Sequence, residues 1–155
     1  FLDLNVLDKF IEDINIAGSV FSKAKKVLCY HNHALEFQKI NNEIILERIY
    51  KNTDNRYIQG EPDVYWIQKG GHDPISWCKK LKNRLPLIHL KDFIMLNEHE
   101  SYYSEIGNGN LDIKNIIREA KLSGCKWYIV EQDECKGDPF ISIETSFNNL
   151  LEFVT

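Results

Sequence analysis

Apolar residues recur along the chain in two alternating patterns, helical spacing in the longer segments and short unbroken runs between them. Apolar positions from Leu4 to Ile16 follow helical spacing and Gly18 interrupts them, so residues 4–25 are predicted as two helical pieces or one helix with a weak middle. Four more segments are predicted as helices, at residues 44–51, 74–83, 111–122 and 141–153. Four short apolar runs are predicted as strands, at residues 27–30, 56–64, 85–88 and 127–130.

Turn and capping residues separate these elements. Asp73 and Pro74 are typical of an N-cap followed by proline at the first helical position. Gly124 ends the helix predicted at residues 111–122. Residues 93–109 show no clear periodicity and are predicted as an irregular loop.

The alternation of strands and helices indicates parallel βα units. A doubly wound sheet that binds dinucleotides is expected to carry a glycine-rich turn directly after a strand. In this chain Gly107-Asn108-Gly109 follows a long loop, and the chain contains no GxGxxG. The pattern therefore favours an α/β fold of the (β/α)8 TIM-barrel type, of which the chain supplies about four βα units.

Each predicted strand leads into titratable side chains. His31 and His33 follow the first strand and share one face by alternation, and His89 and Lys91 do the same after the third. Glu131 follows the fourth strand with no turn residue between. Because parallel strands of a barrel present their carboxyl ends at one face, we expect these side chains to meet at one site.

Several of these residues also have ordinary structural explanations. A histidine pair such as His31 and His33 is equally typical of structural histidines, and Asp63 after Pro62 is more typical of a turn. A cluster of His, Lys and Asp at residues 89–92 is harder to explain as core, because Lys and Asp are rarely buried without partners.

Three carboxylates and one histidine form a candidate ligand set: Glu36, Asp63, His89 and Glu131. Such an oxygen-rich set with one imidazole suits Mn²⁺, Mg²⁺, Co²⁺ or Fe²⁺ better than a thiolate-bound structural zinc. The ion would polarise a carbonyl oxygen as a Lewis acid. A neighbouring glutamate would then remove a proton from the adjacent carbon, and a second glutamate would return one.

Composition narrows the function classes. The 155 residues are 43% hydrophobic and 27% charged, with a formal net charge of -4, which argues against the basic face that nucleic-acid binding needs. No apolar run approaches the roughly 20 residues of a membrane span, and no signal peptide is evident. Four cysteines without a CxxC pair are interpreted as reduced thiols, which predicts a cytoplasmic location: Cys29, Cys78, Cys125 and Cys135.

The motifs, taken together, resemble those of the sugar phosphate isomerase/epimerase family of xylose isomerase-like TIM barrels, which also contains inosose dehydratases and ketose 3-epimerases. The matching pieces run in family order from about residue 25 to the end. They are Tyr30-His31-Asn32-His33 with Glu36-Phe37, Asp63-Val64-Tyr65-Trp66, His89-Leu90-Lys91-Asp92, Glu105 with Gly107-Asn108-Gly109-Asn110, and Trp127 to Asp133.

The resemblance implies roles for individual residues. It implies a divalent metal, with Mn, Co, Mg and Zn all open, held by Glu36, Asp63, His89 and Glu131. It further implies that Glu36 and Glu131 act as catalytic acid and base. It implies that the sugar substrate is contacted by His31, His33, Lys91 and Glu105. Asn108 departs from the family pattern, because many relatives carry Glu there.

Length is the main departure from the family. A (β/α)8 barrel needs roughly 250 residues, so residues 1–155 are predicted as one partial barrel domain, corresponding to the second half. Residue 1 is Phe within a periodic apolar pattern, which is typical of a fragment of a longer chain. Four strands alone would expose two sheet edges, which predicts either a missing N-terminal half or self-association.

Three functions remain open at this stage. The first is a metal-dependent sugar, keto-sugar or inosose isomerase, epimerase or dehydratase, acting as part of a longer chain. The second is a catalytically incomplete half-barrel remnant with a binding role or none. The third, a metal-dependent apurinic endonuclease, is disfavoured by the acidic balance and the absence of a multi-histidine pattern.

Overall fold

The structure is a computed structural model that describes residues 3–154. Four short parallel strands form its centre: β1 (Leu28–His31), β4 (Ile58–Glu61), β5 (Leu87–Leu90) and β8 (Trp127–Val130). β1 pairs with β4 and β5 pairs with β8. A parallel bridge between Asp63 and His89 joins the two pairs, and the His89 amide donates to the Pro62 carbonyl at 3.0 Å. The spatial order of the strands therefore follows the sequence, as in a barrel wall.

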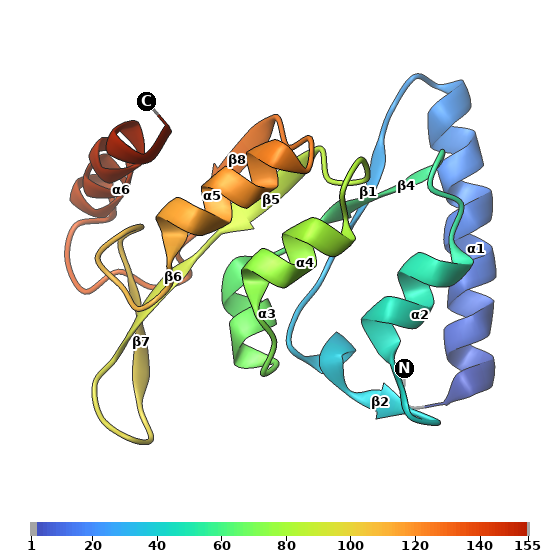
Figure 1. Cartoon of the computed structure of the whole chain (residues 1–155), viewed down its shortest axis with the longest axis horizontal. Coiled ribbons are helices and arrows are strands. Elements are labelled where there is room, and N and C mark those ends of the chain that lie inside the picture. Colours follow the sequence, from blue (N-terminus) through green and yellow to red (C-terminus); the bar gives the residue numbers. More distant parts are fainter. Residues whose placement is uncertain (1–2, 155) are drawn as a thin grey trace.

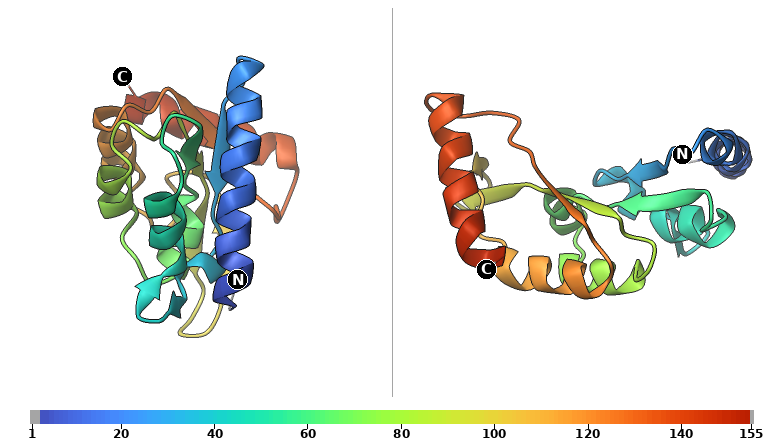
Figure 2. Two further views of the ribbon diagram at one scale, coloured as in Figure 1. Left: turned by 90° about the vertical axis from the view of Figure 1, so that its right-hand side faces the viewer. Right: turned by 90° about the horizontal axis from the view of Figure 1, so that it is seen from above.

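Six α-helices accompany these strands: α1 (Leu4–Lys23), α2 (Ile45–Asn52), α3 (Val64–Lys69), α4 (Pro74–Lys80), α5 (Ile113–Leu122) and α6 (Pro139–Val154). A 3-10 helix (Leu35–Phe37) and two small antiparallel pairs complete the described part. The pairs are β2 (Lys39–Ile40) with β3 (Glu43–Ile44) and β6 (Asp92–Met95) with β7 (Ser101–Ser104). α1 and α6 lie at opposite ends of the molecule (Figure 1), and the wall between them is curved but open (Figure 2).

The predicted elements are present with shifted bounds. The segment predicted at residues 4–25 is one helix, Leu4–Lys23, which continues through Gly18. A Cβ at Gly18 would stand 2.6 Å from Ile58, which explains the glycine. The third strand begins at Leu87 rather than at residue 85, because Pro86 has no N–H to donate to a neighbouring strand. The segment predicted as a strand at residues 56–64 ends at Glu61, since Asp63 caps a helix there.

Several elements were not predicted: α3, the 3-10 helix, the β2–β3 pair and the β6–β7 hairpin. The short helix α3 follows Asp63, whose carboxylate accepts the Trp66 amide hydrogen at 3.1 Å and so begins the helix. The β6–β7 hairpin lies in the segment predicted as an irregular loop at residues 93–109. The prediction of that loop was therefore wrong in its first part.

The main core lies between the strands and helices α2 to α5. Ile88 and Leu90 of β5 are fully buried against residues of the surrounding helices such as Val64, Ile67 and Ile117. A second cluster joins α1 to α2 through Leu7, Ile11, Ile45 and Ile49. Burial of these side chains fixes the strands whose ends carry the candidate site.

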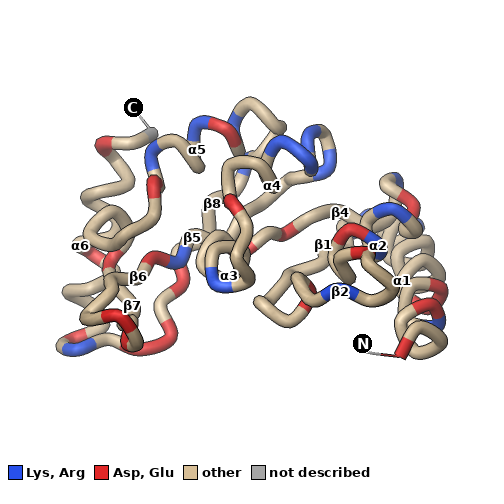
Figure 3. The backbone as a smooth tube through the Cα atoms, turned by 60° about the horizontal axis from the view of Figure 1, so that its bottom comes forward, with Lys and Arg blue, Asp and Glu red and all other residues tan. Residues whose placement is uncertain are grey.

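The end of the wall formed by β8 and α6 exposes apolar side chains. Trp127 of edge strand β8 is 68% exposed, and Phe140 of α6 is 80% exposed. Figure 3 shows α6 with few charged positions along its length. Large exposed apolar faces are uncommon on a monomer and are typical of interaction or ligand-binding surfaces. Among residues 3–154, no helix is both long and apolar enough to cross a membrane.

Candidate metal centre

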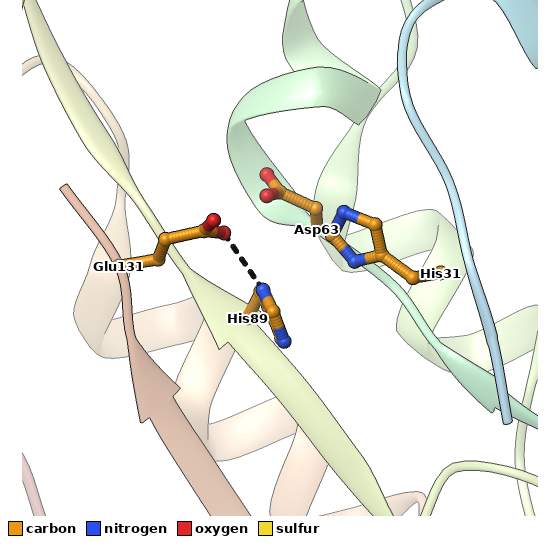
Figure 4. A group of neighbouring side chains, drawn as sticks. All are labelled: His31, Asp63, His89 and Glu131. Atoms are coloured by element: carbon orange, nitrogen blue, oxygen red, sulfur yellow. Dashed lines mark hydrogen bonds and ion pairs between the residues drawn. The ribbon is translucent and has the colours of Figure 1, made fainter. Parts of the chain in front are cut away.

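Four side chains from the four strand ends converge on one point. His31 ends β1, Asp63 follows β4, His89 lies in β5 and Glu131 follows β8. Their potential ligand atoms all lie within 4.8 Å of one another (Figure 4). We call these residues the four-residue group. Their convergence follows from the parallel order of the strands, which brings the carboxyl ends to one face.

His89 lies between two carboxylates. Its Nδ1 atom is 2.8 Å from Oε2 of Glu131, and its Nε2 atom is 2.7 Å from Oε1 of Glu61. Both distances are those of strong hydrogen bonds to a charged acceptor. The ring of His89 is therefore held from both sides, with one nitrogen toward the four-residue group.

Two polar atoms in the four-residue group are buried without a hydrogen-bond partner: Oδ2 of Asp63 and Nδ1 of His31. Oδ2 of Asp63 lies 3.6 Å from the ammonium of Lys91, and the two form an ion pair beyond hydrogen-bond distance. Buried polar atoms are costly to leave unpaired, so an ion in contact with both would offset that cost. The donors, two imidazoles and two carboxylates, suit a divalent transition-metal ion.

Protonation in the site also fits a cation. Burial, together with the nearby His89 and His33 rings, lowers the pKa of His31 to about 4, so its imidazole is neutral at pH 7. Burial raises the pKa of Asp63 to about 6, although the Trp66 amide opposes the rise. Burial also acts to raise the pKa of Glu131, but hydrogen bonds from His89 and Lys91 outweigh it and lower that pKa. These residues therefore present lone pairs and negative charge at neutral pH.

Lys91 is the cation beside the four-residue group. Only 2% of its side chain is exposed, and its Nζ atom lies 3.2 Å from carboxylate oxygens of both Glu131 and Asp133. Burial acts to lower the pKa of Lys91, but Asp63, Glu131 and Asp133 outweigh it, so the pKa is raised and the ammonium stays charged. The same ammonium stands over three aromatic rings, those of Tyr65, Trp66 and Tyr103, at 5.4 to 6.0 Å.

Comparison with known proteins places this arrangement in a fold family. A sugar phosphate isomerase/epimerase from Parabacteroides distasonis superposes with a TM-score of 0.82 and 32% identity, over 94% of this chain and 52% of that one. The structural relatives of the chain are sugar phosphate isomerase/epimerases and xylose isomerase-like TIM barrels. The resemblance recognised in the motifs is thereby confirmed.

Other comparisons agree with this placement. An inosose dehydratase from Clostridium tetani is 26% identical over 145 residues, covering 81% of this chain and 47% of its own length. A xylose isomerase domain protein from Alicyclobacillus acidocaldarius shares the fold, with a TM-score of 0.72 and 12% identity, over 97% of this chain and 58% of that one. No family model matches the chain. The chain spans about half the length of these relatives, so its fold is that of a partial xylose isomerase-like barrel, here called the half-barrel.

Glu36 is the predicted ligand that the half-barrel does not bring into the four-residue group. The 3-10 helix at Leu35–Phe37 turns its carboxylate back toward β1. There it accepts hydrogen bonds from the Tyr30 hydroxyl and the His33 amide, both at 3.0 Å. His31, predicted as a substrate contact, occupies the corresponding place in the group.

The other predicted substrate contacts lie at different distances from the four-residue group. The ring of His33 lies 5.0 Å from those of both His31 and Trp66. Glu105 lies farther along the chain, where its carboxylate accepts the Ser142 hydroxyl hydrogen at 2.8 Å. That bond ties the loop after β7 to α6 and lowers the pKa of Glu105.

Sequence reasoning gave no role to two residues that the half-barrel places at the site. Glu61 contacts His89, and Trp66 lies beside His33 and Lys91. The available signal for Glu61 was its position two residues before Asp63, at the end of a predicted strand. Trp66 lay inside a recognised motif without a role of its own.

Asp92 organises the loop beside the site. Its carboxylate is fully buried and accepts backbone hydrogen bonds from four residues: Phe93, Gly107, Gly109 and Leu111, at 2.8 to 3.2 Å. A Cβ on Gly109 would stand 2.2 Å from the same carboxylate, which explains the glycine. Asp92 therefore fixes the segment that follows Glu105.

Proposed function

We propose that the half-barrel is the metal-binding part of a sugar, keto-sugar or inosose isomerase, epimerase or dehydratase. Such an enzyme abstracts a proton next to a substrate carbonyl. The relatives support the superfamily. The observation that carries the proposal is the four-residue group, whose ligand atoms lie within 4.8 Å and two of whose buried polar atoms lack a hydrogen bond.

We propose His31, Asp63, His89 and Glu131 as the residues that would hold the ion. This set replaces Glu36 of the sequence-based set with His31, because Glu36 bonds to Tyr30 and the His33 amide. A divalent ion held there would act as a Lewis acid toward a substrate carbonyl. The identity of the metal, whether Mn, Co, Mg or Zn, is left to measurement.

Glu131 is the proposed base. Its carboxylate is 37% exposed, so it is open to a ligand, and its lowered pKa keeps it ionised at neutral pH. Lys91 and His89 hold it in place at 3.2 and 2.8 Å, which pre-organises the proton acceptor. Glu36 remains the proposed second proton carrier, and it would have to leave its bonds to Tyr30 and His33 to act.

The proposed substrate contacts are His31, His33, Lys91 and Glu105. A sugar ring could pack on the aromatic faces of His33 and Trp66, whose centroids are 5.0 Å apart. Lys91 is buried, so it would reach only a substrate bound at the four-residue group, where it also contacts Glu131 and Asp133. We propose a cytoplasmic location on the four free thiols alone.

The open wall bears on whether the half-barrel acts by itself. We propose that residues 1–155 form one partial barrel domain whose apolar ends are covered by four further βα units, from a longer chain or from a second copy. Without such a cover, the four-residue group lacks part of its surrounding wall, and the alternative of a catalytically incomplete half-barrel applies. The exposed β8 and α6 faces support the need for a cover.

The testing experiment is calorimetric titration of Mn²⁺ and Co²⁺ into the metal-free chain, followed by turnover assays on keto-sugars and inososes. Wild type should bind one ion, and Asp63→Ala should weaken binding. In any active assembly, Glu131→Gln should lower kcat by about 10²- to 10⁴-fold, as expected for loss of a general base. Exposed Glu12, on α1, gives the matched control Glu12→Gln, which should change nothing. Absence of metal binding by wild type would refute the proposal.

A further inference from the structure

The carboxylate of Glu61 is paired with the ring of His89 in the interior of the wall. Glu61 ends β4, and its Cα partner on β1 is His31. Its Oε1 atom lies 2.7 Å from Nε2 of His89, while the other ring nitrogen lies 2.8 Å from Glu131. In Figure 4 one nitrogen of His89 faces Glu131 and the other points away from the four-residue group.

We propose that Glu61 is a positioning residue for His89. By accepting the Nε2–H of His89 it fixes the ring so that Nδ1 is the nitrogen that faces the four-residue group. The inference rests on the proposed function, because it assigns the orientation of one of the proposed metal-holding residues. Glu61 itself is not a member of the group.

Glu61 is partly buried, and His89 is its hydrogen-bond partner. Together with Leu28 and the exposed Val27 and Trp127, Glu61 lines an open hollow of about 500 Å³ on the face of the wall, and 21% of its side chain is exposed. A partly buried carboxylate is best satisfied by a nearby donor. The Nε2–H of His89 is such a donor. The bond therefore serves both residues, because it satisfies the carboxylate and fixes the ring.

The hydrogen bond between Glu61 and His89 matters because of how imidazoles bind metals. A histidine ligates through a neutral nitrogen, and a carboxylate on the other N–H fixes both tautomer and ring orientation. A cation held by the four-residue group would need an unprotonated Nδ1 on His89, and the single ring proton would then sit on Nε2. Glu61 is the acceptor in place for that proton.

The alternative is that Glu61 only fills space at the end of β4. Two variants separate the readings. Glu61→Leu keeps the approximate volume and removes the acceptor, whereas Glu61→Gln keeps an acceptor oxygen and removes the charge. Gln59→Leu is the matched control, because Gln59 lies on the same strand and face and its amide donates to the Asn55 carbonyl.

The experiment is Zn²⁺ titration of each variant, combined with long-range ¹H–¹⁵N NMR of the histidine side chains, after circular dichroism has confirmed folding. Wild type should show a protected Nε2–H on His89 with and without Zn²⁺. Glu61→Leu should lose that signal and bind Zn²⁺ about 10- to 100-fold more weakly, as for other carboxylates behind metal-bound histidines. Glu61→Gln should weaken binding less, and Gln59→Leu should match wild type.

The outcomes separate this inference from the proposed function. If wild type binds no Zn²⁺, Mn²⁺ or Co²⁺, the metal proposal fails, while the metal-free NMR still decides whether Glu61 holds the Nε2 proton. If wild type binds metal but Glu61→Leu binds as tightly and keeps the protected Nε2–H, Glu61 is not a positioning residue. Coordination of wild type through Nε2 would overturn the inference as well.

Discussion

The ammonium of Lys91 lies 3.2 Å from Oε2 of Glu131, and the same oxygen lies 2.8 Å from Nδ1 of His89. One carboxylate oxygen of Glu131 thus lies within hydrogen-bond distance of two potential donors. Asp63 and Asp133 also lie within 3.6 Å of the same ammonium. Lys91 therefore supplies the positive charge that keeps several carboxylates close together.

Replacement of Lys91 by Met should leave the neighbouring carboxylates repelling one another. We expect Lys91→Met to lower the free energy of unfolding of the metal-free protein by about 2 kcal/mol, less than for a fully buried pair because Glu131 and Asp133 are partly exposed. Saturating Mn²⁺ should shrink the deficit, since the ion replaces the lost charge. Urea unfolding with and without Mn²⁺ measures both. An equal deficit in the two conditions would contradict the prediction.

The strand-end residues were the part of the site most accessible from the sequence. Asp63, His89 and Glu131 follow or end apolar runs, and the parallel order of the strands decides that they meet. Glu36 lies five residues beyond β1, where a 3-10 turn and two hydrogen bonds set its direction. Periodicity carries no information on such a turn, so the choice between Glu36 and His31 could not be made without the structure.

The unpredicted hairpin has a comparable cause. β6 and β7 are joined by residues 96–100, which lack the Asn-Gly or Asp-Gly pair that signals a tight hairpin. The pairing is instead supported by Asp92, which binds the chain beyond β7 through backbone amides. A contact between residues 15 to 19 positions apart leaves no local pattern in the sequence.

Asp92 should prove important for stability although it lies outside the four-residue group. In Asp92→Asn the side-chain NH₂ group would face backbone N–H groups, which now donate hydrogen bonds to a carboxylate oxygen. We expect a loss of about 2 to 3 kcal/mol in the free energy of unfolding, the range for hydrogen bonds to a buried charge. Hydrogen exchange of the Gly107, Gly109 and Leu111 amides should accelerate.

Asp112→Asn supplies the comparison for Asp92→Asn. Asp112 is an exposed N-cap of α5, and Asn caps a helix about as well as Asp. The two substitutions make the same chemical change, so a similar loss in both would show that the Asp92 contacts are not special.

Asp73 should give a pH-dependent contribution to stability. It caps α4 by accepting the Ile75 and Ser76 amide hydrogens at 3.2 and 2.9 Å. Burial acts to raise the pKa of Asp73, but hydrogen bonds from the Ser76 hydroxyl and both amides outweigh it and lower that pKa. A folded-state pKa below the unfolded value of about 3.9 adds stability above that pH, and this stability is lost as pH falls through the folded-state pKa.

Asp73→Ala should therefore cost about 1 kcal/mol at pH 7, as for other lost N-caps, and less as the pH falls below about 4. Urea midpoints of wild type and variant across pH 3 to 7 measure the trend. Asp73→Asn keeps a neutral cap, so its difference from Asp73→Ala should not depend on pH. A constant cost of Asp73→Ala at all pH values would contradict the assignment.

The exposed edge formed by β8 and α6 should make the isolated chain associate. Trp127 and Phe147 are 68% and 59% exposed on neighbouring elements, and the edge of β8 that faces away from β5 offers backbone hydrogen-bond groups. We expect sedimentation velocity to show species larger than a monomer, in proportions that rise with concentration. Trp127→Lys combined with Phe147→Lys should shift the chain to monomer, because charge disfavours burial of that edge.

Leu122→Lys is the control, since Leu122 is 65% exposed at the end of α5 and its replacement should leave association unchanged. A monomeric wild type at high concentration would show that this edge needs no cover.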